Sequence, residues 1–225
     1  MENDPKSWIV RENAKRENPT SYDDYPNPDA SVVTLYVGKG GNKSGALISQ
    51  KIKKQGKEVL VDDVSKPGSD LAKVGQSMNR LLYATPTLTQ DVHISGTPKV
   101  TIKLASSKPA ANLSVWMVSL PWNDASNAKI TDNIITRGWA DPQNHKSITE
   151  SEPLEPGKFY EVTFELMPDD QVIAKGQQIG FMIFSSDKEF TLHPKPGTEL
   201  TVDLEGTTLQ LPIVGGMSAF NAAVE

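Results

Sequence analysis

Apolar and polar residues alternate along much of the chain with a period of two. Residues 100–104, with the sequence VTIKL, are the clearest example, and the alternation recurs at residues 162–166, 200–204 and 209–213. Successive side chains of a β-strand point to opposite faces, so each segment offers one face to a core and the other to water. The pattern predicts half-buried strands.

Two denser apolar runs, at residues 113–120 and 179–184, predict strands that are buried more deeply. Shorter candidate strands come earlier in the chain, at residues 32–37, 58–61, 81–84 and 92–94. Glycine, proline and aspartate fill the intervals, as turns require. Many short strands separated by turns are typical of a β-sandwich.

A helix is predicted at one place only, over residues 69–80. Leu71, Val74 and Met78 fall roughly on one side of such a helix, although Gly75 weakens the pattern. The sequence therefore predicts an all-β chain with at most one short helix.

The chain is predicted to hold a single domain over residues 31–215, since a β-sandwich of this length can be one unit. Residues 1–30 are polar and contain several prolines, which predicts an extended N-terminal arm. Gly215 and Gly216 end the last strand pattern. Residues 216–225 are therefore predicted to be a flexible tail.

Charge and composition exclude several classes of function. The 225 residues include 23 Lys and Arg against 28 Asp and Glu, which gives a formal net charge of −5. Such a chain is a poor nucleic-acid binder, because these proteins draw much of their affinity from neutralising phosphates. The one lysine cluster, at residues 51–57, is expected to be a solvated hairpin end. The absence of cysteine excludes disulfides, zinc–thiolate sites and iron–sulfur clusters.

The sequence also predicts that the protein does not enter a membrane. No stretch approaches the roughly 20 apolar residues of a membrane-spanning helix. The first residues, MENDP, are acidic and polar, unlike the basic and apolar start of an export signal. We therefore expect no membrane association and a cytoplasmic location.

Known catalytic and ligand-binding motifs are missing from the sequence. The strained turn G-x-S-x-G of α/β-hydrolases is approached at residues 75–79 and 216–220, but both lack the final glycine. His93, His145 and His193 show no metal-binding spacing and are expected on the surface or packed in strands. We therefore predict no catalytic residue, no metal ligand and no cofactor-binding residue.

One segment, residues 136–144 (TRGWADPQN), is expected to be irregular. Tryptophan and arginine are enriched where proteins contact one another, so this segment is a candidate contact surface. Equally, Trp139 could cap the domain's own core and Arg137 could pair with a local carboxylate. Trp116 lies inside a buried strand pattern and is expected in the core. The predicted contact residues are Trp122, Arg137, Trp139, Asp141 and Asn144.

Seven segments, taken in order, resemble one known family. They are residues 79–88 (NRLLYATPTL), 94–98 (ISGTP), 111–115 (ANLSV), 137–144 (RGWADPQN), 152–157 (EPLEPG), 176–180 (GQQIG) and 190–198 (FTLHPKPGT). Each motif is weak alone, but their order and spacing resemble the C-terminal domain of bacterial Xaa-Pro dipeptidyl-peptidases, which are related to the cocaine-esterase-like hydrolases. The resemblance covers residues 79–216 closely and the preceding part more loosely.

The resemblance implies a jelly-roll β-sandwich of the galactose-binding-like type that packs against an α/β-hydrolase catalytic domain. In that family a serine, a histidine and an aspartate release Xaa-Pro dipeptides from peptide N-termini through an acyl-enzyme. All three lie upstream of this domain, and no position here matches the nucleophile motif. The family's enzymes are mostly intracellular, often dimeric, and use no metal or cofactor.

We therefore expect this chain to be the C-terminal accessory domain of such a serine peptidase, inactive by itself. Its expected partners are the catalytic domain of the same enzyme and, in the full-length protein, a second copy, while peptide substrates are met only through the full enzyme. The alternative is an independent carbohydrate- or ligand-binding jelly-roll module, with Trp122 and Trp139 as stacking platforms. A third hypothesis, a complete small hydrolase, needs a catalytic triad that the three histidines do not offer.

Overall fold

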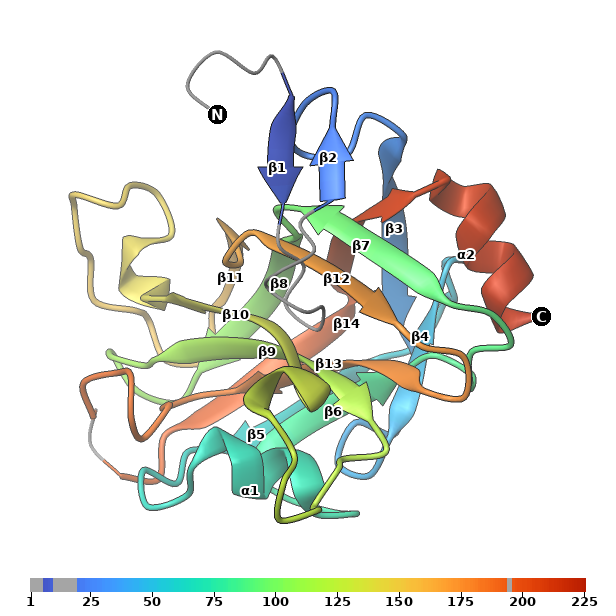
Figure 1. Cartoon of the computed structure of the whole chain (residues 1–225). Helices are drawn as coiled ribbons and strands as arrows, with labels where there is room; N and C mark the ends of the chain where they lie inside the picture. Colours follow the sequence, from blue (N-terminus) through green and yellow to red (C-terminus); the bar gives the residue numbers. More distant parts are fainter. Residues whose placement is uncertain (1–5, 10–19, 194–195) are drawn as a thin grey trace.

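The structure, a computed structural model, describes residues 6–9, 20–193 and 196–225, and strands dominate it (Figure 1). The strands are β1 (Ser7–Ile9), β2 (Thr20–Tyr22), β3 (Ala30–Val37), β4 (Gly45–Ile48), β5 (Lys57–Val61), β6 (Arg80–Ala84), β7 (Val92–Gly96), β8 (Lys99–Ser106), β9 (Leu113–Leu120), β10 (Ile134–Ala140), β11 (Phe159–Glu165), β12 (Asp169–Ile173), β13 (Gln178–Phe184) and β14 (Glu199–Val214). The described helices are α1 (Gly68–Lys73), α2 (Gly216–Val224) and the single 3-10 turns η1 (Ile130–Asp132) and η2 (Pro142–Asn144). The all-β prediction is confirmed.

The main body consists of two sheets that face each other and are joined through β4 (Figure 1). The first sheet has the order β10-β9-β13-β6, all antiparallel, and β4 then runs parallel to β6. The second is organised around the long strand β14, with β5 and β3 along one edge and β8 and β7 along the other. Strands β11 and β12 extend it beyond β8 and β7. Since β4 also pairs with β3, backbone hydrogen bonds continue from one sheet into the other.

The hydrophobic core lies between the inner faces of the two sheets. In β8, Val100, Ile102 and Leu104 are buried and the residues between them are partly exposed, so the alternation in the sequence is an alternation of faces. Burying a large apolar side chain fully stabilises the fold by about 1.5–3 kcal/mol. The first sheet contributes Leu81, Tyr83, Val115, Met117, Phe181 and Ile183 to this core.

The outer face of the first sheet is covered as well, which explains why its strands are dense apolar runs. Helix α1 packs on this face and closes a second apolar cluster, made of Leu71, Ala72, Leu82, Trp116, Val118, Met182 and Phe184. The approach is so close that a side-chain carbon at Gly68 would come within 2.5 Å of the Trp116 ring. The predicted deep burial of residues 113–120 and 179–184 is confirmed.

The described part of the chain holds two short α-helices where at most one was predicted. Helix α1 is shorter than the predicted helix over residues 69–80, because the chain becomes extended at Val74. The second helix, α2, replaces the predicted flexible tail, so that prediction is wrong. Gly215, with a φ of 78°, turns the chain out of β14 in a left-handed conformation. The helix then buries Phe220 and Ala223 against the core.

The predicted N-terminal arm is described only in part. Strands β1 and β2 pair antiparallel, and residues 23–29 lead from β2 into β3. Tyr22, at the end of β2, is buried. The rest of the predicted arm, residues 1–5 and 10–19, lies outside the described residues.

A buried arginine fastens α1 to the first sheet. Arg80, the first residue of β6, is inaccessible to solvent, and its guanidinium donates to four main-chain carbonyl oxygens. Two belong to the end of α1, Leu71 at 3.1 Å and Val74 at 2.7 Å. The other two belong to the β3–β4 connection, Gly41 at 2.7 Å and Lys43 at 2.8 Å. A cation suits this place, because carbonyls at a helix C-terminus lack intrahelical partners and carry partial negative charge.

We predict that Arg80→Lys lowers the free energy of unfolding by about 2–4 kcal/mol, because an ammonium cannot reproduce the fork that reaches four carbonyls. Arg80→Met should cost more, since it leaves all four without their donor. Urea denaturation checks both, with Lys43→Met, an exposed side chain, as a control expected to stay within about 0.5 kcal/mol. A loss for Arg80→Lys no larger than that of the control would contradict the role assigned to Arg80.

Candidate functional site

Two of the predicted contact residues, Arg137 and Trp139, project from the outer face of the first sheet. The segment expected to be irregular is in fact strand β10 as far as Ala140. Arg137 and Trp139 are two residues apart on this strand and therefore share a face. Their register partners on β9 are Trp116 and Ser114.

The Arg137 guanidinium lies among three aromatic rings. Its central carbon is 4.7 Å from the ring centre of Phe190, 5.3 Å from that of Trp116 and 6.0 Å from that of Trp139. Trp139 and Phe190 stack on each other, with ring centres 5.2 Å apart. Such contacts attract a cation to the electron-rich ring faces. No described residue forms a hydrogen bond or an ion pair with this guanidinium.

A buried carboxylate organises the same place. Asp187 Oδ2 accepts hydrogen bonds from both indoles, at 2.9 Å from Trp116 Nε1 and 3.0 Å from Trp139 Nε1. The Asp187 carbonyl accepts from the backbone N–H groups of Phe190 and Thr191, which closes the turn that carries the Phe190 ring. We call Trp116, Arg137, Trp139, Asp187 and Phe190 the Arg137 cluster.

A second buried carboxylate fixes the turn from the other side. Asp62, just after β5, accepts from the Ser186 backbone N–H at 2.9 Å and from the Ser186 hydroxyl at 3.0 Å. Because Ser186 precedes Asp187, this contact sets the position of the carboxylate that the two indoles bind. The residues of the Arg137 cluster thus come from β9, β10 and the turn after β13, and Asp62 at the end of β5 fixes that turn.

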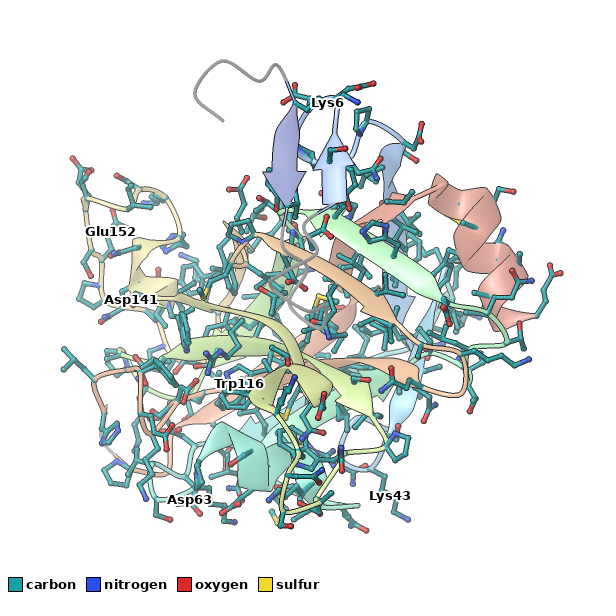
Figure 2. All side chains as sticks on the ribbon, in the orientation of Figure 1. Lys6, Lys43, Asp63, Trp116, Asp141 and Glu152 are labelled. Atoms are coloured by element: carbon teal, nitrogen blue, oxygen red, sulfur yellow. The ribbon has the colours of Figure 1, made fainter. Side chains whose placement is uncertain are left out.

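The other predicted contact residues do not join the Arg137 cluster. Trp122 is half-buried against the apolar cluster under α1, with Lys73 Nζ 5.9 Å from its ring centre. Asp141 accepts from the Gln143 backbone N–H at 2.9 Å and caps the start of η2. Asn144 donates to the Ile148 carbonyl at 3.4 Å. Figure 2 shows Asp141 on the loop at the margin of the molecule, apart from Trp116.

Sequence reasoning missed Asp187 and placed Trp116 only in the core. Trp116 is buried as expected, but its indole N–H also serves the cluster. Asp187 follows two serines after β13, where nothing in the local pattern marks it. It is 71 residues from Trp116 and 48 from Trp139, so only the folded chain brings them together.

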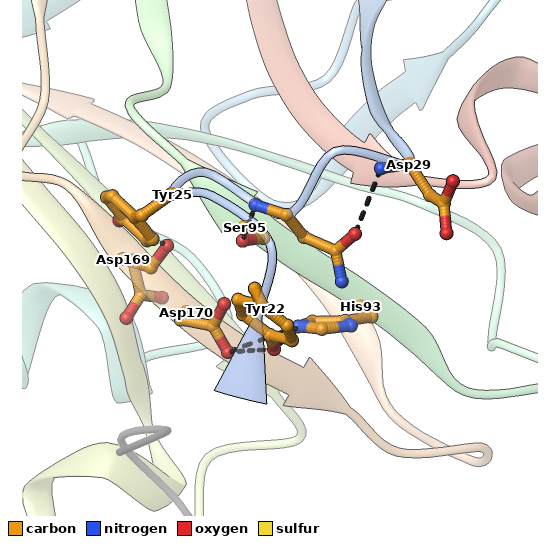
Figure 3. Close-up of polar contacts among 8 residues, drawn as sticks. Tyr22, Tyr25, Asp29, His93, Ser95, Asp169 and Asp170 are labelled. Carbon is orange, nitrogen blue, oxygen red and sulfur yellow. Dashed lines mark hydrogen bonds and ion pairs between the residues drawn. The ribbon is translucent and has the colours of Figure 1, made fainter. Parts of the chain in front are cut away.

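A serine, a histidine and an aspartate do meet elsewhere, between β7 and β12 (Figure 3). His93 Nε2 lies 3.1 Å from Asp170 Oδ1, and the Tyr22 hydroxyl donates to the same oxygen at 3.3 Å. Ser95 lies opposite Asp170 in the register of β7 and β12 and is inaccessible to solvent. In a catalytic triad the histidine stands between the other two and its Nε2 faces the serine. Here the carboxylate stands in the middle, so this group is not a triad.

The Asp170 carboxyl is kept in its charged form by these neighbours. Burial alone would raise its pKa, but the hydrogen bonds from His93, Ser95 and Tyr22 and the charge of His93 outweigh burial. The net result is a pKa below the ordinary value. The group therefore stabilises the folded state at neutral pH, which makes it structural.

Known proteins resemble this chain over nearly its whole length. A family model described as the X-Pro dipeptidyl-peptidase C-terminal non-catalytic domain matches residues 2–219. A Rhodopirellula baltica protein provisionally named Xaa-Pro dipeptidyl-peptidase is 56% identical over 216 residues, which are 96% of this chain and 34% of that protein. A Bacillus anthracis protein with the same provisional name is 37% identical over 214 residues, 94% of this chain and 34% of that protein.

A solved structure shares the fold. The aminopeptidase from the marine sediment archaeon Thaumarchaeota archaeon matches with a TM-score of 0.70 and 19% identity, over 93% of this chain and 40% of that one.

These matches and the fold define the chain as a non-catalytic β-sandwich domain. It belongs to the family of X-Pro dipeptidyl-peptidase C-terminal non-catalytic domains, which confirms the resemblance found in the sequence motifs. The chain spans about a third of the length of the curated relatives it matches. None of the helices in the described part of the chain has the length and apolar character needed to cross a bilayer.

We predict that Asp187→Ala lowers the free energy of unfolding by about 2–4 kcal/mol, because the buried indole N–H of Trp116 and the half-buried one of Trp139 lose their acceptor. The tryptophan emission of the folded protein should shift as well. Urea denaturation followed by fluorescence checks both, with the exposed Asp29→Ala as control. An unchanged emission spectrum together with a loss equal to that of the control would contradict the assigned hydrogen bonds.

For Asp170 we predict a pH-dependent effect. A carboxyl with a lowered pKa in the folded state adds stability above its unfolded pKa of about 3.9, and this is lost as pH falls through the folded value. Asp170→Asn should therefore lower the free energy of unfolding by about 1–3 kcal/mol at pH 7. This difference in free energy between the variant and the unmodified protein should narrow below about pH 4. Urea midpoints at several pH values test this, and a gap that stays constant would show that the charge of Asp170 is irrelevant.

Proposed function

We propose that this chain is the accessory domain of a serine peptidase and packs against its α/β-hydrolase catalytic domain. The observation that carries the proposal is the match of residues 2–219 to a C-terminal non-catalytic domain of X-Pro dipeptidyl-peptidases. The same proposal includes release of Xaa-Pro dipeptides by the full enzyme, a cytoplasmic location and dimerisation of the full-length protein. Its support is the family membership and the names of the relatives.

The Arg137 cluster is the face that we propose for docking. Half of the Phe190 surface is exposed, and Leu192, two residues further along the same loop, is 91% exposed. Exposed apolar side chains beside a half-buried tryptophan and arginine are the composition of an interface centre. Contacts between domains of one chain typically bury about 600–1,500 Å², which a face of this kind can supply.

The geometry favours docking over carbohydrate binding. A sugar-binding platform needs an open, flat aromatic face. One face of Trp139 is stacked on Phe190, and Trp122 is half-buried in the apolar cluster under α1. Neither predicted platform therefore offers an isolated flat ring.

The test uses the part of the Rhodopirellula baltica relative that this chain does not match. That part, this chain, and the two expressed together are assayed for release of an amine from an Xaa-Pro anilide. We expect no release by this chain alone, and association with a gain in activity or stability when both are present. Release by this chain alone, or failure to associate, contradicts the proposal.

The docking face has its own test in the same assay. Phe190→Ser combined with Leu192→Ser should weaken association by about tenfold or more, because it removes the exposed apolar anchors. Val32→Ser is the matched control, since Val32 is 64% exposed on β3 in the second sheet. Equal effects of the two changes would place the docking face elsewhere.

A further inference from the structure

We infer that Arg137 binds a carboxylate, and specifically an aspartate or glutamate side chain on the surface of the catalytic domain. The inference rests on the proposed function and adds the chemistry of the contact. It begins from a contrast between two arginines on the same face of the first sheet. Arg80 uses its guanidinium for four hydrogen bonds within the domain, whereas Arg137 makes none with any described residue.

Arg137 is nevertheless held in place. It lies opposite Trp116 in the regular register of β9 and β10, and its guanidinium contacts three rings. Those rings are themselves fixed by the Asp187 carboxylate and by the stacking of Trp139 on Phe190. A side chain that is already immobilised loses little entropy on binding, so its hydrogen bonds contribute more to affinity.

The guanidinium fork matches a planar acceptor. Arginine presents parallel N–H groups that bind a carboxylate or a phosphate with two hydrogen bonds. The acid nearest in the cluster, Asp187, is already used by the two indoles and forms no ion pair with Arg137 among the described residues. No described acid pairs with Arg137, so a carboxylate that binds it would come from another surface.

Charge and surroundings favour a single carboxylate over a phosphate. The Arg137 cluster contains one cation, and the chain as a whole carries a net charge of −5, which disfavours a polyanion. Of the exposed residues in the same turn, Phe190 and Leu192 are apolar, and Lys188 and Glu189 carry opposite charges that offset each other. An acidic side chain ringed by apolar residues on a protein surface fits these features. About two thirds of the length of the relatives lies outside this chain and can supply it.

The test measures the dissociation constant between this chain and the remaining part of the Rhodopirellula baltica relative. Arg137→Met should raise the dissociation constant about 30-fold or more. The dissociation constant of Arg137→Lys should lie between those of Arg137→Met and the unmodified chain. Arg137→Glu should be weaker than Arg137→Met, because like charges repel, although both changes remove the ring contacts. Lys175→Met, an exposed lysine in the β12–β13 turn, is the control and should stay within about twofold.

Salt separates an ion pair from a packing role. Binding of the unmodified chain should weaken between about 0.05 and about 0.5 M NaCl, and Arg137→Met should lose most of that dependence. Equal affinities of Arg137→Met and Arg137→Glu, or an unchanged salt dependence, would contradict binding of a carboxylate by Arg137. The proposed docking face would still be supported if the variant changed at Phe190 and Leu192 binds weakly. If the unmodified chain does not bind at all, the proposed function fails together with this inference. Sedimentation of this chain alone tests a second copy as occupant, and self-association abolished by Arg137→Met would also overturn the inference.

Discussion

The hydrogen bonds of the buried Arg80 guanidinium allow the first sheet to be covered on both faces. Helix α1 has six residues, too few to be stable by itself, so its place depends on what binds its ends and its apolar side. Arg80 joins the end of that helix to the β3–β4 connection. Without α1 the Trp116 ring would lose its cover, and Trp116 is one of the two indoles that hold Asp187. The Arg137 cluster therefore depends on an arginine at the other end of the same sheet.

Inward-facing carboxylates hold the loops in place, as the Arg80 guanidinium holds α1. Glu58 accepts from the backbone N–H groups of Gly40 at 2.7 Å and Gly41 at 3.0 Å, and from the Tyr83 hydroxyl at 2.8 Å. Burial, with the Glu58 charge, raises the pKa of Tyr83, so the hydroxyl stays a donor. The glycine-rich turn at residues 38–41 thus binds a carboxylate of the chain itself. Gly41 must be glycine there, because a side-chain carbon would lie 2.8 Å from Glu58 and from the Tyr83 ring.

The sequence predicted features that depend on neighbouring residues, and it missed features that depend on residues far apart in the chain. Alternation in residues 100–104 depends on neighbours along the strand, and it was predicted correctly. Helix α2 was missed because a short stretch after two glycines is helical only when Phe220 and Ala223 can pack on the core. Arg137 and Trp139 could be singled out by residue type, but the cluster could not. Its organiser, Asp187, gains its role from indoles 48 and 71 residues away.

The group of Ser95, His93 and Asp170 shows why residue types alone do not make an active site. Catalysis needs a nucleophile that a substrate can reach and a base whose free nitrogen faces it. Ser95 is fully buried beside Asp170, and its hydroxyl accepts from the Asn27 backbone N–H at 3.0 Å, so no substrate can reach it. The Nε2 atom of His93 faces Asp170 and Tyr22. Serine, histidine and aspartate can cleave a peptide bond when the histidine stands between the other two. In this protein the aspartate stands in the middle instead. The three residues therefore connect β7 to β12 and support the fold.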